Sequence, residues 1–169
     1  MPHFNRDALQ ASLKASGILY VFLGDELGAR RKEPECYVDG VAKYDLIEKT
    51  LAFAEGLERI RKGTSKFRIA MMCAEKDPLT CHRTILVARA LKYENDIRHI
   101  VDERKVLSHE ELEQALLGRW GMAHPELFQE QDELLDEAYR KQSDEIAYTE
   151  PKDKASPQGQ GQGQVTVND

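Results

Sequence analysis

The chain has 169 residues, 41% of them hydrophobic and 32% charged, a composition that excludes fibrous and wholly disordered proteins. Its net charge of −6 excludes a uniformly cationic surface that would attract phosphate backbones or anionic membranes. The three cysteines are too few, and odd in number, for a disulfide framework, and no apolar run reaches the roughly 20 residues of a membrane span. We therefore expect a cytoplasmic protein that does not enter membranes.

Apolar runs that suit strands alternate with amphipathic patterns that suit helices. Helices are predicted at 5–16, 44–61, 81–93, 108–117 and 130–148. Strands are predicted at 18–23, 67–73 and 97–101, with a long loop over 24–43. Ser108 and Glu111 have the spacing of a capping box at the start of a helix.

This alternation predicts an α/β fold, in which a short, mostly parallel sheet is flanked by helices. Residues 1–148 are expected to form one α/β domain. Residues 149–169 include alternating glutamine and glycine and are expected to be a disordered, low-complexity tail.

The candidate chemistry lies between the second predicted strand and the helix that follows it. Cys73 ends the strand, and Cys81, His82 and Arg83 begin the helix. Strand ends and helix N-termini favour anions and thiolates, so Cys73 or Cys81 is a candidate nucleophile. His82 would then act as a base or orienting group, and Glu75 as an acid–base group. The alternative is that both cysteines are structural, because free cysteine is often buried.

A second candidate segment is the glycine-containing basic loop after the first predicted strand. Gly28 would allow close backbone approach, and Arg30 and Arg31, together with Arg83, would hold an anion. These residues predict a small phosphorylated, carboxylated or nucleotide-like substrate. The alternative for this loop alone is a solvated basic turn.

Two other readings of the cysteines remain. Cys36, Cys73, Cys81 and His82 contain the donor types of a zinc site, but seven residues separate Cys73 from Cys81, wider than the spacing of a zinc knuckle. We therefore expect neither a metal nor a cofactor. The other reading is a non-catalytic module that binds an anion or a nucleic-acid end, with structural cysteines.

The chain resembles the family called domain of unknown function 488, from Phe4 to about Tyr148. The residues that carry the resemblance are Phe4-Asn5, Leu27-Gly28, Arg30-Arg31, Cys36 to Gly40, Tyr44, Met72 to Glu75, and Cys81-His82-Arg83. The resemblance implies a Rossmann-like three-layer domain with the cysteines in its functional pocket. Members of this family usually begin with a further strand and helix, which this chain lacks. It therefore predicts an uncovered sheet edge through which the chain could self-associate.

Overall fold

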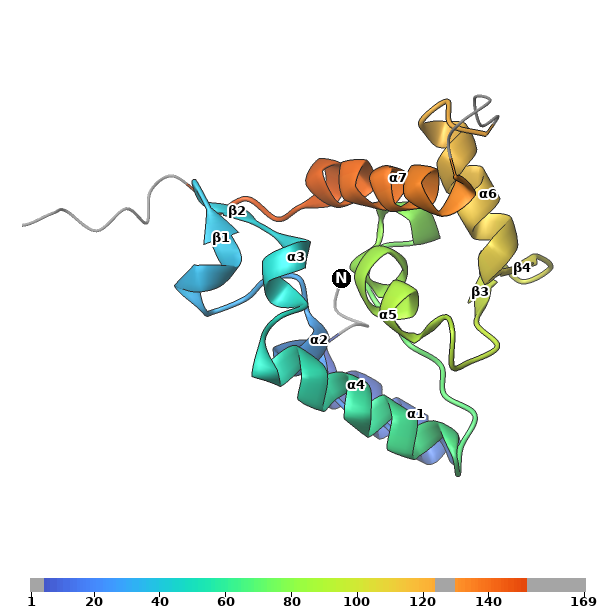
Figure 1. The fold of residues 1–169 in the computed structure, drawn as a ribbon. Helices are drawn as coiled ribbons and strands as arrows, with labels where there is room; N and C mark the ends of the chain where they lie inside the picture. Colours follow the sequence, from blue (N-terminus) through green and yellow to red (C-terminus); the bar gives the residue numbers. More distant parts are fainter. Residues whose placement is uncertain (1–4, 124–129, 152–169) are drawn as a thin grey trace, which may run out of the picture.

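The computed structural model describes residues 5–123 and 130–151, which form helices joined by turns and two short hairpins (Figure 1). The α-helices are α1 (Arg6–Ala15), α2 (Gly24–Leu27), α3 (Tyr44–Ile47), α4 (Leu51–Thr64), α5 (Arg89–Leu91), α6 (His109–Arg119) and α7 (Gln131–Ile146). The shorter helices are the 3₁₀ turns η2 (Pro34–Cys36) and η3 (Pro78–Thr80) and the π-helix η4 (Arg83–Ala88). The strands are β1 (Tyr37–Val38), β2 (Val41–Ala42), β3 (Arg98–Ile100) and β4 (Val106–Ser108).

The predicted Rossmann-like α/β fold with a mostly parallel sheet is wrong. Within the described residues, the strands form two separate antiparallel pairs, β1 with β2 and β3 with β4. The predicted strands 18–23 and 67–73 form no strand at all. Only the prediction at 97–101 is confirmed, as β3, and its partner is the next strand along the chain.

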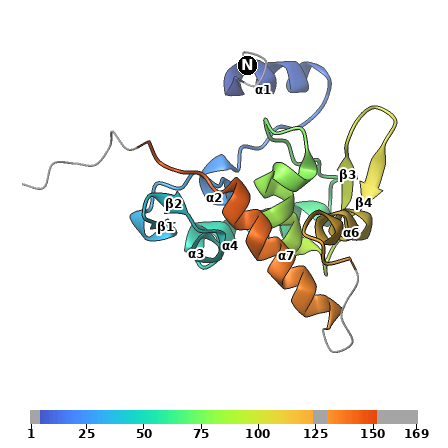
Figure 2. The same cartoon turned by 90° about the horizontal axis from the view of Figure 1, so that it is seen from above.

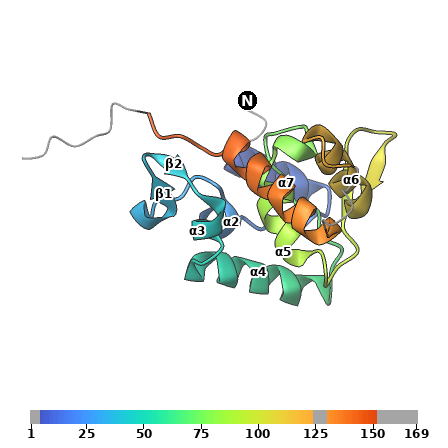
Figure 3. The ribbon, with the colours of Figure 1, turned by 45° about the horizontal axis from the view of Figure 1, so that its top comes forward.

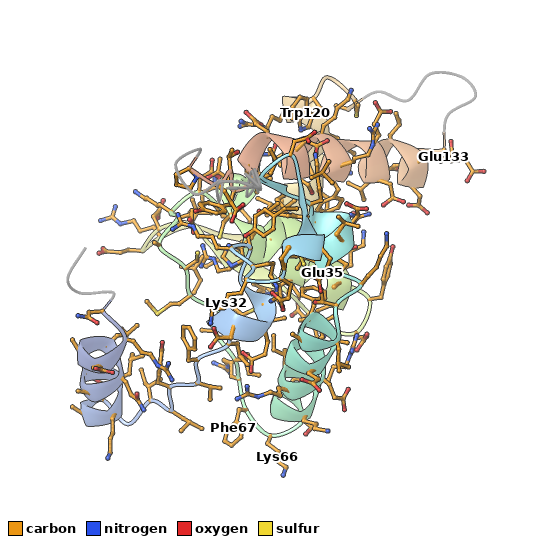
Figure 4. All side chains as sticks on the ribbon, turned by 90° about the vertical axis from the view of Figure 1, so that its left-hand side faces the viewer. Lys32, Glu35, Lys66, Phe67, Trp120 and Glu133 are labelled. Atoms are coloured by element: carbon orange, nitrogen blue, oxygen red, sulfur yellow. The ribbon has the colours of Figure 1, made fainter. Side chains whose placement is uncertain are left out.

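Both failed strand predictions fall on apolar segments that the fold does not bury. Their exposed side chains are Ile18, Leu19, Val21, Phe22, Phe67, Ile69 and Met72. Phe67, for example, lies at the outer end of the molecule just beyond α4, far from Trp120 beside α7 (Figure 4). An apolar run predicts burial, but a strand forms only where a neighbouring strand satisfies its backbone N–H and C=O groups. Neither segment has such a neighbour in the described part of the chain.

The helix predictions hold better, because their signals are local. The pattern at 44–61 becomes two helices, α3 and α4, separated where the side chain of Thr50 accepts a hydrogen bond from the N–H of Phe53 and caps α4. The capping box is confirmed, since Ser108 accepts from Glu111 N–H while the Glu111 carboxylate accepts from Ser108 N–H. The predicted helix 81–93 is η4 followed by α5 and begins two residues late, at Arg83.

The segment predicted as a loop over 24–43 contains α2, η2 and the β1–β2 hairpin. Its turn places Asp39 and Gly40 in the left-handed region, with φ of 52° and 75°. Two residues of the predicted tail continue this hairpin: Thr149 bridges to Val41, and Glu150 N–H donates to Gly40 O at 2.8 Å. The rest of the predicted tail, 152–169, lies outside the described residues, as does Phe4.

The core lies where α7 crosses η4 and α5, with α6 beside it and α4 on the opposite side (Figures 1 and 3). Buried residues here include Phe53, Ile85, Leu86, Leu116 and Tyr139. By contrast, α1 stands apart from these helices (Figure 2), and none of its residues is buried. No helix among the described residues combines the length and apolar character needed to cross a bilayer.

Candidate functional site

Four of the predicted site residues meet at one place, between the segment that follows α4 and the start of η4. One ligand-type atom from each of Cys73, Glu75, Cys81 and His82 lies within 4.8 Å of the other three. Cys73 Sγ is 3.7 Å from His82 Nδ1, and Cys81 Sγ is 3.7 Å from the Glu75 carboxylate. The expected convergence of two sulfurs, an imidazole and a carboxylate is therefore present without the parallel sheet from which it was inferred.

The turn between the two cysteines brings them together. The carboxylate of Asp77 accepts a hydrogen bond from Leu79 N–H at 2.9 Å and caps η3, which begins with Pro78. Cys81 N–H then donates to Pro78 O, which completes the turn. This compact 3₁₀ turn reverses the chain, so that Cys81 returns to the side of Cys73.

Arg83 joins the two sides of the site. Its Nε–H donates to Cys81 Sγ at 3.1 Å, while its two terminal nitrogens donate to the carbonyl oxygens of Met71 and Glu75 at 3.2 and 3.0 Å. One guanidinium thus ties the segment 71–75 to the start of η4. It also places a positive charge against the Cys81 sulfur.

The two thiols differ in exposure and in acidity. Cys81 is fully buried, whereas Cys73 is partly exposed. A hydrogen bond from Cys73, followed by those from Arg83, lowers the pKa of Cys81 to about 6 despite its burial. The same contact with Cys81, together with burial, raises the pKa of Cys73. Such values belong to the pair, so the pair loses its first proton easily and its second with difficulty.

The acidic and aromatic neighbours complete the site. Burial raises the pKa of Glu75, but hydrogen bonds from Cys73 and then from backbone and other neighbours outweigh it, so the net pKa is lowered. Tyr44 is buried against this cluster, and burial followed by the charges of Cys81 and Glu75 raises its pKa. The sequence marked Tyr44 only as a lid or packing residue, and no local pattern connects it with the cysteines.

The predicted anion-binding loop does not join the cluster. Arg31 is buried, and its guanidinium donates to the carbonyl oxygens of Asp25 and Glu26 and to the carboxylate of Glu33. Arg30 lies over the ring of Tyr148, with 4.8 Å from its Cζ to the ring centroid. Neither arginine has a hydrogen bond or ion pair with the four site residues in the described part of the chain.

Gly28 has a packing role rather than a visible ligand. A Cβ at this position would lie 2.3 Å from the carbonyl oxygen of Gly24, so any side chain would collide with the end of α2. Cys36, the third thiol, is also set apart from the cluster. It is fully buried near Arg31, and burial raises its pKa.

A second polar cluster joins β3, α6 and α7. His99 Nε2 lies 2.9 Å from His109 Nδ1, and the hydroxyl of Tyr139 lies 3.1 Å from His109 Nε2 and donates to Glu113 at 2.8 Å. A cavity of about 380 Å³ lies beside this cluster, lined in part by Lys92, His109 and Glu113. The sequence suggested a structural role for His99 and did not indicate the other members.

Comparison with known proteins identifies a family but no characterised relative. No curated protein matches the chain, and no solved structure matches it. The model of the family described as "Domain of unknown function DUF488" matches residues 1–90, just over half of the chain, and ends well short of Tyr148. This range contains Cys73, Glu75, Cys81 and His82. The chain therefore belongs to the DUF488 family.

Proposed function

We propose that the protein carries out thiol-dependent chemistry at the cluster of Cys73, Glu75, Cys81 and His82. The observation that supports it is the convergence of the four reactive groups within 4.8 Å, with the guanidinium of Arg83 against one of the sulfurs. Reactive cysteines occupy sites of this kind, with an electropositive group and a base nearby. Structural cysteines need neither.

Cys73 is the sulfur that meets the substrate, because it is the partly exposed member of the pair. Its S–H donates to the Glu75 carboxylate, and His82 Nδ1 lies 3.7 Å from the same sulfur. Cys73 gives its proton to one of these groups as its sulfur bonds to an electrophilic atom of the substrate. The leaving group departs with the electron pair of the broken bond and accepts that proton.

Cys81 supports this step without touching the substrate. It is fully buried, and its sulfur receives the Arg83 N–H, so negative charge shared by the two sulfurs is stabilised from the protein side. Cys81 and Arg83 are therefore positioning residues in this proposal, and Cys73 is the nucleophile.

The predicted small anionic substrate remains open under this proposal. The guanidinium groups of Arg31 and Arg83 are already engaged within the protein, and Glu75 adds negative charge beside Cys73. A phosphorylated or nucleotide-like substrate would have to be bound by other cations. We therefore propose the reaction type, and leave the charge of the substrate as a prediction.

The proposal is tested by alkylating the metal-free protein with iodoacetamide at pH 7 in the presence of a chelator, and following each cysteine by mass spectrometry. We expect Cys73 to react at least tenfold faster than glutathione under the same conditions, and Cys36 to react only after unfolding. His82→Asn should slow Cys73 at least fivefold, because it removes the nearby base.

Cys36→Ser is the matched control, since it removes a buried thiol outside the cluster and should leave the rate at Cys73 unchanged. A Cys73 that reacts no faster than glutathione, in a protein whose Cys36 stays protected, would overturn the proposal. A rate that is insensitive to His82→Asn would remove the role of the imidazole.

A further inference from the structure

We infer that Cys73, Glu75, Cys81 and His82 form a binding site for a borderline-soft divalent cation of the zinc type. This inference goes beyond the proposed function, because it needs no substrate and no reactive thiol. It stands on the arrangement of the four donor atoms and on the groups that hold them.

The spacing of the donor atoms is close to that of a tetrahedral site. With zinc–sulfur bonds of about 2.3 Å and zinc–nitrogen bonds of about 2.0–2.1 Å, neighbouring ligand atoms lie about 3.3–3.8 Å apart. The Cys73 sulfur is 3.7 Å from His82 Nδ1, and the Cys81 sulfur is 3.7 Å from the Glu75 carboxylate. All four atoms lie within 4.8 Å of one another, so small side-chain rotations close the set around one ion.

The donor types select the class of metal. Two thiolates and an imidazole favour zinc and similar ions over magnesium or calcium, which prefer oxygen ligands. Two thiolates and one carboxylate carry three negative charges, and a divalent cation leaves one. The guanidinium of Arg83, bonded to Cys81 Sγ and to the carbonyl oxygen of Glu75, balances that remaining charge.

The surroundings also resemble those of a built site. Cys81 is fully buried, and Arg83 and the Asp77-capped η3 turn hold it opposite Cys73. Groups that hydrogen-bond to ligands in this way orient the ligands and strengthen metal binding. Glu75, by contrast, is exposed, so the cation would enter from its side.

The wide sequence spacing, which argued against a metal, is no obstacle in the folded chain. The zinc-knuckle spacing assumes that one tight turn joins the two cysteines. Here the seven intervening residues contain η3, which returns Cys81 to Cys73. Cys36, which the sequence offered as a fourth ligand, is replaced by Glu75.

The test is a competition titration of the chelator-treated, reduced full-length protein with zinc and a chromophoric zinc indicator. We expect one zinc ion per chain, with at least 100-fold weaker binding in Cys73→Ser and at least tenfold weaker binding in Glu75→Gln. The matched controls are Cys36→Ser and Glu35→Gln, which change the same residue types outside the cluster and should bind zinc as the unmodified chain does.

A spectroscopic measurement on the unmodified chain keeps the test independent of how the variants fold. Cobalt(II) bound at this site should show thiolate-to-metal charge-transfer absorption and the intense visible bands of tetrahedral coordination. Weak octahedral bands without charge transfer would overturn the inference, as would zinc binding that Cys73→Ser leaves unchanged.

The metal site and the thiol chemistry can fail separately. Zinc binding with slow alkylation of the metal-free protein would support the metal site and contradict the proposed function. Fast alkylation of Cys73 without zinc binding would do the reverse. If both hold, stoichiometric zinc should slow the alkylation of Cys73 at least tenfold, because the ion occupies its sulfur.

Discussion

The guanidinium of Arg83 donates its Nε–H to the sulfur of Cys81 at 3.1 Å and holds the far side of the site through two backbone carbonyls. Arg83 therefore does not act as the free anion holder that its position in the sequence indicated. Its planar fork reaches three acceptors at once, which a lysine ammonium on a flexible stem does not reproduce.

We expect Arg83→Lys and Arg83→Ala to lower the free energy of unfolding by about 1–3 kcal/mol, because each leaves hydrogen-bond acceptors of the segment 71–75 unpaired. Amide hydrogen exchange in a peptide covering this segment should become faster in both variants. Arg68→Lys is the control, since Arg68 is exposed and has no hydrogen bond in the described residues. Exchange in Arg83→Lys equal to that of the unmodified chain would contradict the three-point contact.

Two helical glycines should respond to alanine with opposite signs. A Cβ at Gly56 would lie 2.7 Å from Leu27 Cδ2 and 2.8 Å from Glu26 Cβ, between α4 and α2. Gly56→Ala should therefore lower the free energy of unfolding by about 1–3 kcal/mol. Gly118 in α6 has no atom within 4 Å of such a Cβ, so Gly118→Ala should raise it by about 0.5–1 kcal/mol. Urea denaturation measures both, and a change of the same sign would show that the contact of Gly56 is not limiting.

The hydroxyl of Tyr139 should contribute measurably to stability. It is buried, donates to Glu113 and lies 3.1 Å from His109 Nε2. Tyr139→Phe leaves these partners unsatisfied and should cost about 1–3 kcal/mol, with a lower melting temperature in calorimetry. Tyr93→Phe is the matched control, because Tyr93 is 87% exposed, and should change stability by less than about 0.5 kcal/mol. Equal melting temperatures for the two variants would contradict this role.

The pH dependence of stability should show the burial of His99. Burial, followed by the charges of His109 and Arg83, lowers the pKa of His99 from 6.5 to about 4. Between these values the unfolded chain binds a proton that the folded chain does not, so stability falls as the pH drops from 6.5 to 4. The shift corresponds to at most about 3 kcal/mol.

Urea titrations at pH 7, 6, 5 and 4 test this expectation, and His99→Phe should flatten the curve across that window. Glu113→Gln should act lower in the pH range. Burial opposes ionisation of Glu113, yet hydrogen bonds from three neighbouring side chains lower its pKa from 4.5 to about 2. Stability from Glu113 is therefore lost between these two values. An unchanged slope above pH 4.5 in His99→Phe would show that His99 does not titrate as described.

The segments that carry the candidate site could be read from the sequence, but its internal contacts could not. Cys73 with Glu75, and Cys81 with His82, stand out as two short motifs, and both belong to the cluster. The engagement of Arg31 with backbone carbonyls and the burial of Tyr44 against the cysteines involve residues whose local patterns carry no sign of these partners.

By itself, the sequence determined the features that depend on residues a few positions apart. The capping box of Ser108 and Glu111 and the helical periodicity of α4 and α6 are of this kind, because a helix satisfies its backbone from within. Only the tertiary structure decided whether the apolar runs at 18–23 and 67–73 became strands, since a strand depends on a partner from elsewhere in the chain. It likewise decided the distance between Cys73 and Cys81, which the η3 turn sets rather than the edge of a sheet.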